Sequence, residues 1–123
     1  EDRKRLLGTG LVELLQAQCA VWPHKQRPAD FRKPLTGKLP VLILSGEFDP
    51  VTPPRYGDMV AKHLPNSRHI VVKGAGHNVL PVGCMPKLFA KFLETADAKA
   101  LDIGCIESLT YSPMFTGFYG SEP

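Results

Sequence analysis

The sequence lacks an apolar run that approaches the length of a membrane span. A spanning helix needs about 20 consecutive apolar residues, whereas apolar runs here are short, as at residues 40–44. The charged residues 1–5 also lack the basic-then-apolar layout of a signal peptide. We therefore expect no membrane span. We expect the chain to enter a helix partway along a longer protein, with any export signal upstream.

A strong excess of positive charge is also missing. The 15 Lys and Arg residues are nearly balanced by 12 Asp and Glu residues, which leaves a formal net charge of +3. The densest basic stretch, residues 25–38, is interrupted by prolines. Nucleic-acid binders concentrate positive charge on one face or helix. We therefore expect no nucleic-acid binding and interpret this stretch as a solvated loop.

Metal-binding patterns are absent too. The chain has no C-x-x-C motif, and its four histidines do not cluster with its three cysteines, so neither a metal nor a cofactor is expected. Cys84 and Cys105 flank a helical segment, and a bridge between them would stabilise the fold by about 3 kcal/mol. Cys19 would then be a buried free thiol or would pair with a cysteine in a preceding segment. A bridge would place the protein in an oxidising compartment, secreted or periplasmic.

Hydrophobic periodicity divides the 123 residues into one domain with four stretches. Residues 3–21 have the apolar spacing of an amphipathic helix. The expected order is a leading helix at 1–22, an irregular crossing at 23–39, a strand-helix-strand-helix core at 40–105 and an apolar tail at 106–123.

The core has the pattern of an α/β protein. Residues 40–44 are apolar on both faces, as in a strand buried inside a parallel sheet. Thr52 is expected to cap the following helix, and residues 68–73 form the second strand. A strand-helix-strand unit with short loops is a right-handed parallel crossover. Two strands alone leave both sheet edges open. We therefore expect an incomplete sheet and an apolar tail that packs on a surface.

Each strand is followed by a titratable residue. Asp49 comes after the first strand, and His77 follows the second in a glycine-rich turn. Loops at the carboxyl ends of parallel strands meet at one edge of the sheet, where ligands and catalytic groups collect. A carboxylate beside a histidine is the orienting half of a Ser-His-Asp triad. Either motif alone is typical of an ordinary turn, but their order and spacing favour a catalytic pair.

The two loops resemble the last two catalytic loops of the α/β-hydrolase fold. They read Leu-Ser-Gly-Glu-Phe-Asp-Pro-Val-Thr-Pro at residues 44–53 and Gly-Ala-Gly-His at residues 74–77. With Cys-Ala-Val-Trp-Pro at 19–23 and the cysteines Cys84 and Cys105, residues 15–106 resemble the C-terminal region of secreted bacterial tripeptidyl aminopeptidases and prolyl-iminopeptidase-like hydrolases. The resemblance implies a triad in the order Ser, Asp, His, with Asp49 and His77 in the second and third roles.

The chain departs from this family in lacking a nucleophile. No Gly-x-Ser-x-Gly elbow and no oxyanion-hole loop occur, and in the family both precede the segment seen here. Ser45 lies near Asp49 but has no strand-to-helix elbow around it. We therefore expect this chain alone to be inactive. The serine would lie on the remaining N-terminal part of the hydrolase, an exopeptidase that acts on a peptide or a small ester or amide.

Four further residues are assigned roles. Glu47 is a candidate contact for a substrate amino group. His63, expected on a helix, and His69, expected at the start of a strand, are interpreted as structural or solvated, and Trp22 as a packing anchor. The alternative function is a non-catalytic α/β module that pairs with another chain, or forms a homo-oligomer, through its open sheet edge.

Overall fold

The computed structural model describes residues 8–111, 113–118 and 120. By its contacts the chain divides into two compact units, one up to Lys33 and one from Pro34 onward.

The first unit contains helix α1, Gly10–Val21. The expected helix began at residue 3, but Gly8 has a positive φ of 61°, outside the right-handed helical region, and Thr9 is the N-cap. Residues 1–7, which the expectation also covered, lie outside the described residues.

Helix α1 ends at Val21, two residues before Pro23. Trp22, the residue before Pro23, has an extended ψ of 129°, because the proline ring disfavours the helical conformation of its predecessor. From there to residue 33 the chain has no regular element. The irregular segment expected after residue 22 therefore begins at a defined helix stop.

Helix α1 buries none of its residues. Leu11, Leu14 and Leu15 are 70%, 54% and 51% exposed, and Trp22 is 73% exposed, so the interpretation of Trp22 as a packing anchor is wrong within this unit. Cys19 is free and exposed, so it is not a buried thiol, and a partner outside this chain stays a prediction. Despite these exposed apolar side chains, no helix in the described part of the chain has both the length and the apolar character that crossing a membrane requires.

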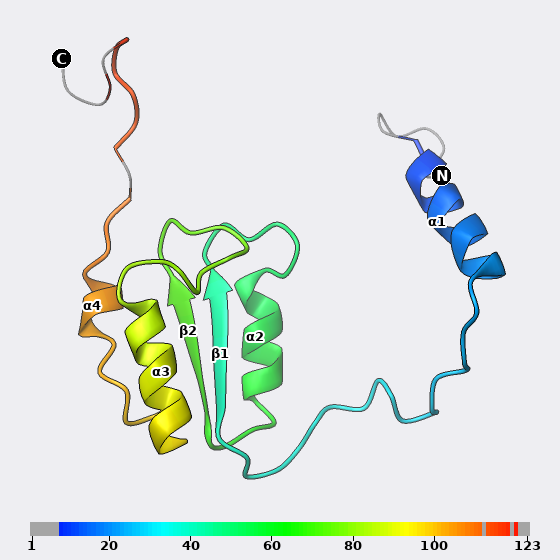
Figure 1. Ribbon diagram of the computed structural model, residues 1–123, viewed down its shortest axis with the longest axis horizontal. Helices are drawn as coiled ribbons and strands as arrows, with labels where there is room; N and C mark the ends of the chain where they lie inside the picture. The colour runs from blue at the N-terminus through cyan, green and yellow to red at the C-terminus, as the bar shows by residue number, and fades with distance from the viewer. Residues whose placement is uncertain (1–7, 112, 119, 121–123) are drawn as a thin grey trace. The chain divides into compact units, whose positions relative to one another are not determined.

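The second unit confirms the α/β class and the incomplete sheet. Figure 1 shows two neighbouring strands, β1 and β2, that point the same way. They pair in parallel from Val41↔Ser67 to Gly46↔Val72, and they are the whole sheet among the described residues. The elements of this unit are β1 (Val41–Gly46), α2 (Pro54–Ala61), β2 (Ser67–Val72), α3 (Met85–Thr95) and α4 (Gly104–Glu107).

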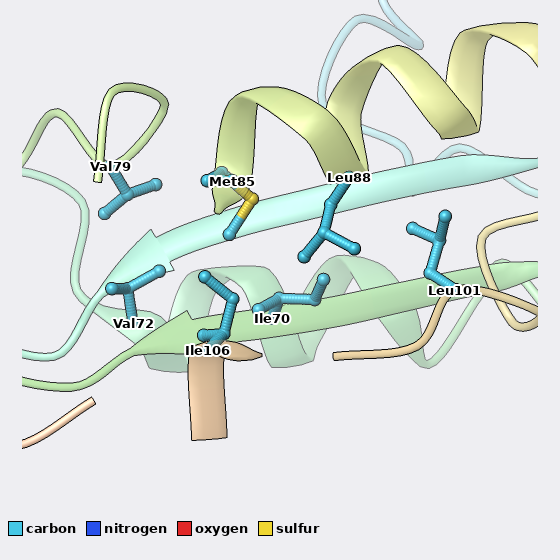
Figure 2. Close-up of a cluster of buried hydrophobic side chains, with 7 residues drawn as sticks. All are labelled: Ile70, Val72, Val79, Met85, Leu88, Leu101 and Ile106. Atoms are coloured by element: carbon cyan, nitrogen blue, oxygen red, sulfur yellow. The ribbon is translucent and has the colours of Figure 1, made fainter. Parts of the chain in front are cut away.

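The hydrophobic core lies on one face of the sheet, between the strands and α3. Successive side chains of a strand point to opposite faces, and Ile70 and Val72 of β2 share the face that meets Met85 and Leu88 of α3 (Figure 2). Burying a side chain of this size stabilises the fold by about 1.5–3 kcal/mol. The cluster is completed by Val79, Leu101 and Ile106.

The opposite face of the sheet is covered by α2 and is partly polar. His69, the residue before Ile70 in β2, points to this face and has a side chain that is only 7% exposed. A Cβ atom on Gly57 of α2 would overlap the imidazole ring of His69, so only glycine allows the helix to lie this close. The sheet therefore has an apolar core face under α3 and a histidine-centred face under α2.

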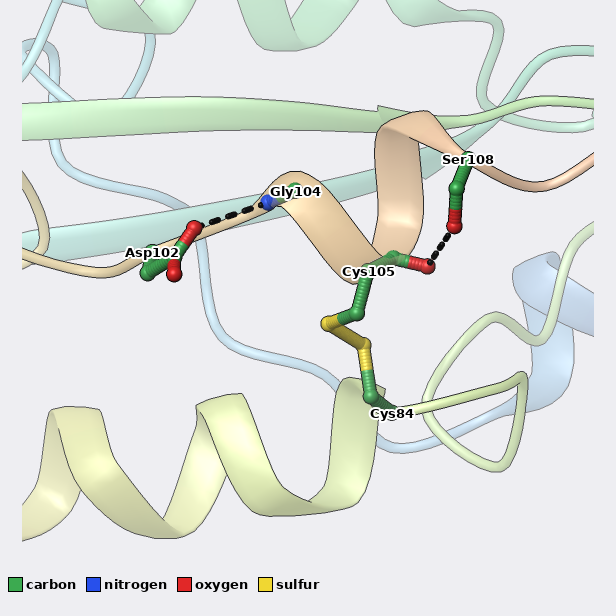
Figure 3. Close-up of a disulfide and its surroundings, with 5 residues drawn as sticks. All are labelled: Cys84, Asp102, Gly104, Cys105 and Ser108. Atoms are coloured by element: carbon green, nitrogen blue, oxygen red, sulfur yellow. Dashed lines mark hydrogen bonds between the residues drawn. A yellow bond between two sulfur atoms is a disulfide. The ribbon is translucent and has the colours of Figure 1, made fainter.

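The expected disulfide is present. Cys84, immediately before α3, is bonded to Cys105 in α4, with Cα atoms 6.3 Å apart (Figure 3). The bridge fixes the short helix α4, and with it the core residue Ile106, against the start of α3. The tail therefore begins at a covalently held point.

Removing this bridge is expected to destabilise the chain. The cysteines are separated by 21 positions, and opening such a loop in the unfolded state corresponds to about 3 kcal/mol. The double variant Cys84→Ser/Cys105→Ser should lose about that much free energy of unfolding in urea titrations followed by circular dichroism. Cys19→Ser, at the exposed thiol, is the matched control and should leave the midpoint unchanged. A double variant as stable as the unaltered protein would contradict the expectation.

Candidate functional site

The candidate site lies where the two parallel strands end at the same level. Because Gly46 of β1 is paired with Val72 of β2, the loops that follow leave the same edge of the sheet. Two backbone hydrogen bonds join the loops: Glu47 N–H donates to the Val72 carbonyl at 3.0 Å, and Phe48 N–H donates to the Ala75 carbonyl at 3.0 Å. These two main-chain hydrogen bonds hold the loop carrying Asp49 beside the loop carrying His77.

Gly46 makes this close approach possible. A Cβ atom at this position would lie 2.6 Å from the carbonyl oxygen of Ala75 and would overlap the carbonyl oxygen of Gly76. Both obstacles are backbone atoms, which cannot rotate away as a flexible side chain can. A side chain of any kind at residue 46 would push the two loops apart.

Asp49 and His77 form a hydrogen-bonded pair at this edge. The distance from His77 Nδ1 to Asp49 Oδ2 is 2.8 Å. The two side chains differ sharply in exposure: 3% for Asp49 and 61% for His77. The carboxylate is therefore shielded by the fold, and the imidazole is open to a group brought from outside.

The second unit supplies Asp49 with three further donors. Its Oδ1 accepts the N–H groups of Val51 and Thr52 at 2.8 and 3.0 Å, and its Oδ2 accepts the Thr52 hydroxyl at 2.7 Å. Burial raises the pKa of the Asp49 carboxyl, but the hydrogen bonds from Thr52, His77 and Val51 outweigh burial and hold that pKa well below its ordinary range. The carboxylate is therefore ionised at neutral pH.

Thr52 does not have the role expected from the sequence. Helix α2 begins at Pro54 with Pro53 as its N-cap, and Thr52 makes no capping hydrogen bond. Its hydroxyl is instead used by Asp49, and it also lies 3.4 Å from His77 Nδ1. The capping assignment is wrong because Pro53 is the N-cap, so Thr52 lies one residue before the capping position, and its hydroxyl is directed to the Asp49 carboxylate.

This arrangement prepares His77 for proton transfer. An ionised carboxylate has no proton to donate, so the hydrogen between Asp49 and His77 belongs to Nδ1. Nε2 is then the unprotonated, basic nitrogen of the neutral ring. An exposed imidazole with this tautomer fixed can accept a proton from a hydroxyl group and return it to a leaving group, with the carboxylate stabilising the intervening cation.

A second Ser-His-Asp constellation lies on the α2 face. Ser45 Oγ is 2.9 Å from His69 Nε2, and Asp58 Oδ1 is 2.9 Å from His69 Nδ1. Ser45 is 7% exposed, the His69 side chain is equally buried, and Gly57 packs on the ring. Ser45 is thus enclosed by the second unit, and its hydroxyl is paired with a buried ring. The network ties α2 to both strands.

The remaining sequence candidates are placed as follows. Both carboxylate oxygens of Glu47 accept hydrogen bonds, one from Gly74 N–H and one from the Tyr111 hydroxyl. His63 is exposed and lies beyond α2, which ends at Ala61, so its expected position on the helix is wrong. Neither the Thr52 nor the Tyr111 contact was expected from the sequence. The signal for Thr52 was the Asp-x-x-Thr spacing, a frequent side chain–backbone turn.

Nothing in the described residues is arranged for a metal. No group of three or more His, Cys, Asp or Glu side chains in this part of the chain is placed to hold an ion. The chemistry available at the site is that of a carboxylate-oriented imidazole.

Comparison with known proteins gives one match. The family described as TAP-like protein has a model that matches residues 4–105, which is more than half of the chain. Comparisons with curated proteins and with solved structures gave no match.

Proposed function

The chain belongs to the TAP-like family of α/β-hydrolases, and from this we propose that it is the C-terminal part of a serine hydrolase that supplies Asp49 and His77 to a serine located elsewhere. The observation that carries the proposal is the hydrogen bond of 2.8 Å between a shielded carboxylate and an exposed imidazole at the carboxyl edge of the sheet. That edge is where an open α/β sheet collects catalytic groups.

The reaction follows from the tautomer of His77. Nε2 takes the proton of the incoming serine hydroxyl as its oxygen attacks the substrate carbonyl carbon, and the Asp49 carboxylate stabilises the imidazolium that forms. The imidazolium then gives its proton to the leaving amine or alcohol, which leaves an acyl-serine. Water, deprotonated by the same nitrogen, then attacks the acyl carbon, and the imidazolium returns this proton to the serine oxygen as the acid product leaves. These steps use only protein groups and water, with no metal or cofactor.

The partner in this reaction is the remaining N-terminal part of the hydrolase. The sequence holds no Gly-x-Ser-x-Gly elbow, and β1 and β2 each have one edge without a strand partner among the described residues. Unpaired edges of apolar strands are sites for further strand pairing. If the N-terminal part adds strands to this sheet, it both supplies the serine and pairs with the open strand edges.

The substrate class and compartment are proposed from the same features. The loops at residues 44–53 and 74–77 resemble those of secreted aminopeptidases. We therefore assign the intact protein an exopeptidase activity on a peptide, with small esters and amides as surrogate substrates. The Cys84–Cys105 bridge supports an oxidising location, secreted or periplasmic.

A second function is favoured by the unpaired strand edges alone. Within the part of the chain that the structure describes, the sheet has two open edges, through which the chain can pair with a second copy of itself and serve as a non-catalytic module. In that case the intact protein has no reactive serine, and the chain is dimeric without a companion segment.

Covalent labelling of the intact protein separates the two functions. A fluorophosphonate should label one serine, and His77→Ala should slow the labelling on the order of 10³-fold or more. His63→Ala, at another exposed histidine, is the matched control and should label at the unaltered rate. The hydrolase proposal fails if the intact protein is not labelled, or if His77→Ala reacts as fast as the unaltered protein.

A further inference from the structure

A single carboxylate connects three segments beside the catalytic pair. Glu47, two residues before Asp49, accepts the Gly74 N–H through Oε2 at 2.8 Å and the Tyr111 hydroxyl through Oε1 at 2.9 Å. Gly74 opens the turn that ends at His77. Three segments therefore meet at this one side chain: the loop after β1 that carries Asp49 (the acid loop), the loop after β2 that carries His77 (the histidine loop), and the tail beyond α4.

Tyr111 is held on this site by more than its hydroxyl group. Its ring stacks on Phe48 with centroids 6.0 Å apart and an interplanar angle of 19°. The Lys73 ammonium lies 4.6 Å from the centre of the same ring, a cation–π contact. Phe48 precedes Asp49 and Lys73 precedes Gly74. Tyr111 thus touches a residue of each catalytic loop in addition to Glu47.

The tail reaches this position from a fixed point. Cys105 anchors α4 to the start of α3, and Leu109 packs against the core cluster. The expectation that the apolar tail packs on a surface therefore holds for its first part. Met114, Phe115 and Phe118 are 86%, 85% and 106% exposed. The remaining tail residues, 112, 119 and 121–123, lie outside the described residues.

The protonation states suit a lasting contact. The Gly74 N–H, the Tyr111 hydroxyl and the Lys73 ammonium lower the pKa of the Glu47 carboxyl, against a smaller opposing effect of burial. The hydrogen bond to Glu47 raises the pKa of the Tyr111 phenol. At neutral pH, the ionised Glu47 carboxylate therefore accepts a hydrogen bond from the protonated Tyr111 hydroxyl. Because the two pKa values move apart, neither group changes its protonation state when the pH shifts moderately from neutral.

We propose that Glu47 and Tyr111 form a latch that holds the His77 loop in register with the Asp49 loop. Glu47 is on this account a positioning residue, and the binding of a substrate amino group that the sequence suggested is the competing role. The inference rests on the proposed function, because the latch matters for the rate only when His77 is the base. Two backbone hydrogen bonds join the loops at Val72 and Ala75, but the His77 imidazole beyond them is 61% exposed and shares a single hydrogen bond with Asp49. Its position therefore depends on the position of its loop. A shift of about 1 Å in a catalytic group costs about 10²-fold in rate.

Conservative variants of the intact hydrolase test the latch. Glu47→Gln keeps one acceptor oxygen and should lower kcat about 10- to 100-fold with KM changed less than about threefold. Tyr111→Phe should lower kcat about 3- to 10-fold, and the double variant should be no slower than Glu47→Gln, since both changes break one unit. The matched controls are Glu94→Gln and Tyr56→Phe, which alter exposed helical residues and should leave kcat unchanged.

The same variants separate the latch from the competing role. If Glu47 binds the substrate amino group, Glu47→Gln raises KM for substrates with a free amino terminus and not for acylated ones, and Tyr111→Phe has no effect. That outcome overturns the latch.

A spectroscopic signature keeps the test independent of the nucleophile. The Nδ1 proton of His77, hydrogen-bonded to Asp49, should give a downfield resonance that weakens through faster solvent exchange in Glu47→Gln and Tyr111→Phe but not in Tyr56→Phe. If the intact protein has no reactive serine, the proposed function is wrong, but this resonance can still be measured and still tests the latch. A resonance unchanged in both latch variants overturns the latch itself.

Discussion

Asparagine at residue 49 is expected to lower kcat/KM of the intact hydrolase about 10⁴-fold. Asp49 Oδ2 faces two groups, the Thr52 hydroxyl and His77 Nδ1. An amide nitrogen there donates a hydrogen to Nδ1, which shifts the ring proton to Nε2 and removes the base. The amide also carries no charge with which to stabilise the imidazolium.

The chain contains a matched control for this substitution. Asp58 also bonds to a histidine, His69, at 2.9 Å, but its side chain is 64% exposed and that ring is buried under α2. Asp58→Asn should therefore change kcat/KM less than about tenfold, because it leaves the exposed imidazole untouched. Pre-steady-state release of the leaving group from an ester substrate measures both variants. If Asp49→Asn stays within tenfold of the unaltered enzyme, Asp49 is not the triad acid.

Alanine at residue 46 is expected to separate the two catalytic loops. Its Cβ would overlap the carbonyl oxygens of Ala75 and Gly76, and relieving the overlap requires the backbone of one loop to move. We expect a loss of about 1–3 kcal/mol in the free energy of unfolding, as for an overpacked core. We also expect a fall in kcat of about 10²-fold from the displaced His77.

Thermal unfolding and kcat measured on the same samples test this expectation. Gly10→Ala is the control, since a Cβ at Gly10 meets nothing within 4 Å and alanine suits a helix. A Gly46→Ala variant with unchanged kcat would show that the loops do not need this close approach. A variant with normal stability but low kcat would locate the damage at the site alone.

The sequence was sufficient to place Asp49 and His77 because a simple rule connects them. Short loops and apolar runs predicted a parallel pair, and parallel strands deliver their following residues to one edge. Cys84 and Cys105 were candidates for a bridge because they flank one helical segment and because both cysteines are part of the family resemblance. The strands and their loops depend on residues that are close together in the sequence, and hydrophobic periodicity predicts such short-range structure.

Contacts between distant segments could not be predicted in the same way. Tyr111 reaches Glu47 across 64 positions, and no pattern near either residue indicates the other. The pairing of Asp58 with His69 was also not predicted from the sequence, although His69 was interpreted as structural or solvated. Asp58 and His69 lie as close together as Asp49 and His77, and only the covering helix α2 makes one pair structural. Whether a histidine ring is buried or exposed depends on the assembled fold, so a short sequence motif cannot predict it.

The short crossover between β1 and β2 has a consequence for how the protein folds. Paired residues such as Val41 and Ser67 are 26 positions apart (67 − 41), and the Asp49–His77 hydrogen bond spans 28 positions. Chain-closure entropy grows only slowly with length, and contacts at small sequence separation form fastest. We therefore expect the Asp49–His77 pair to assemble within this one strand-helix-strand unit, whose closure does not require the serine.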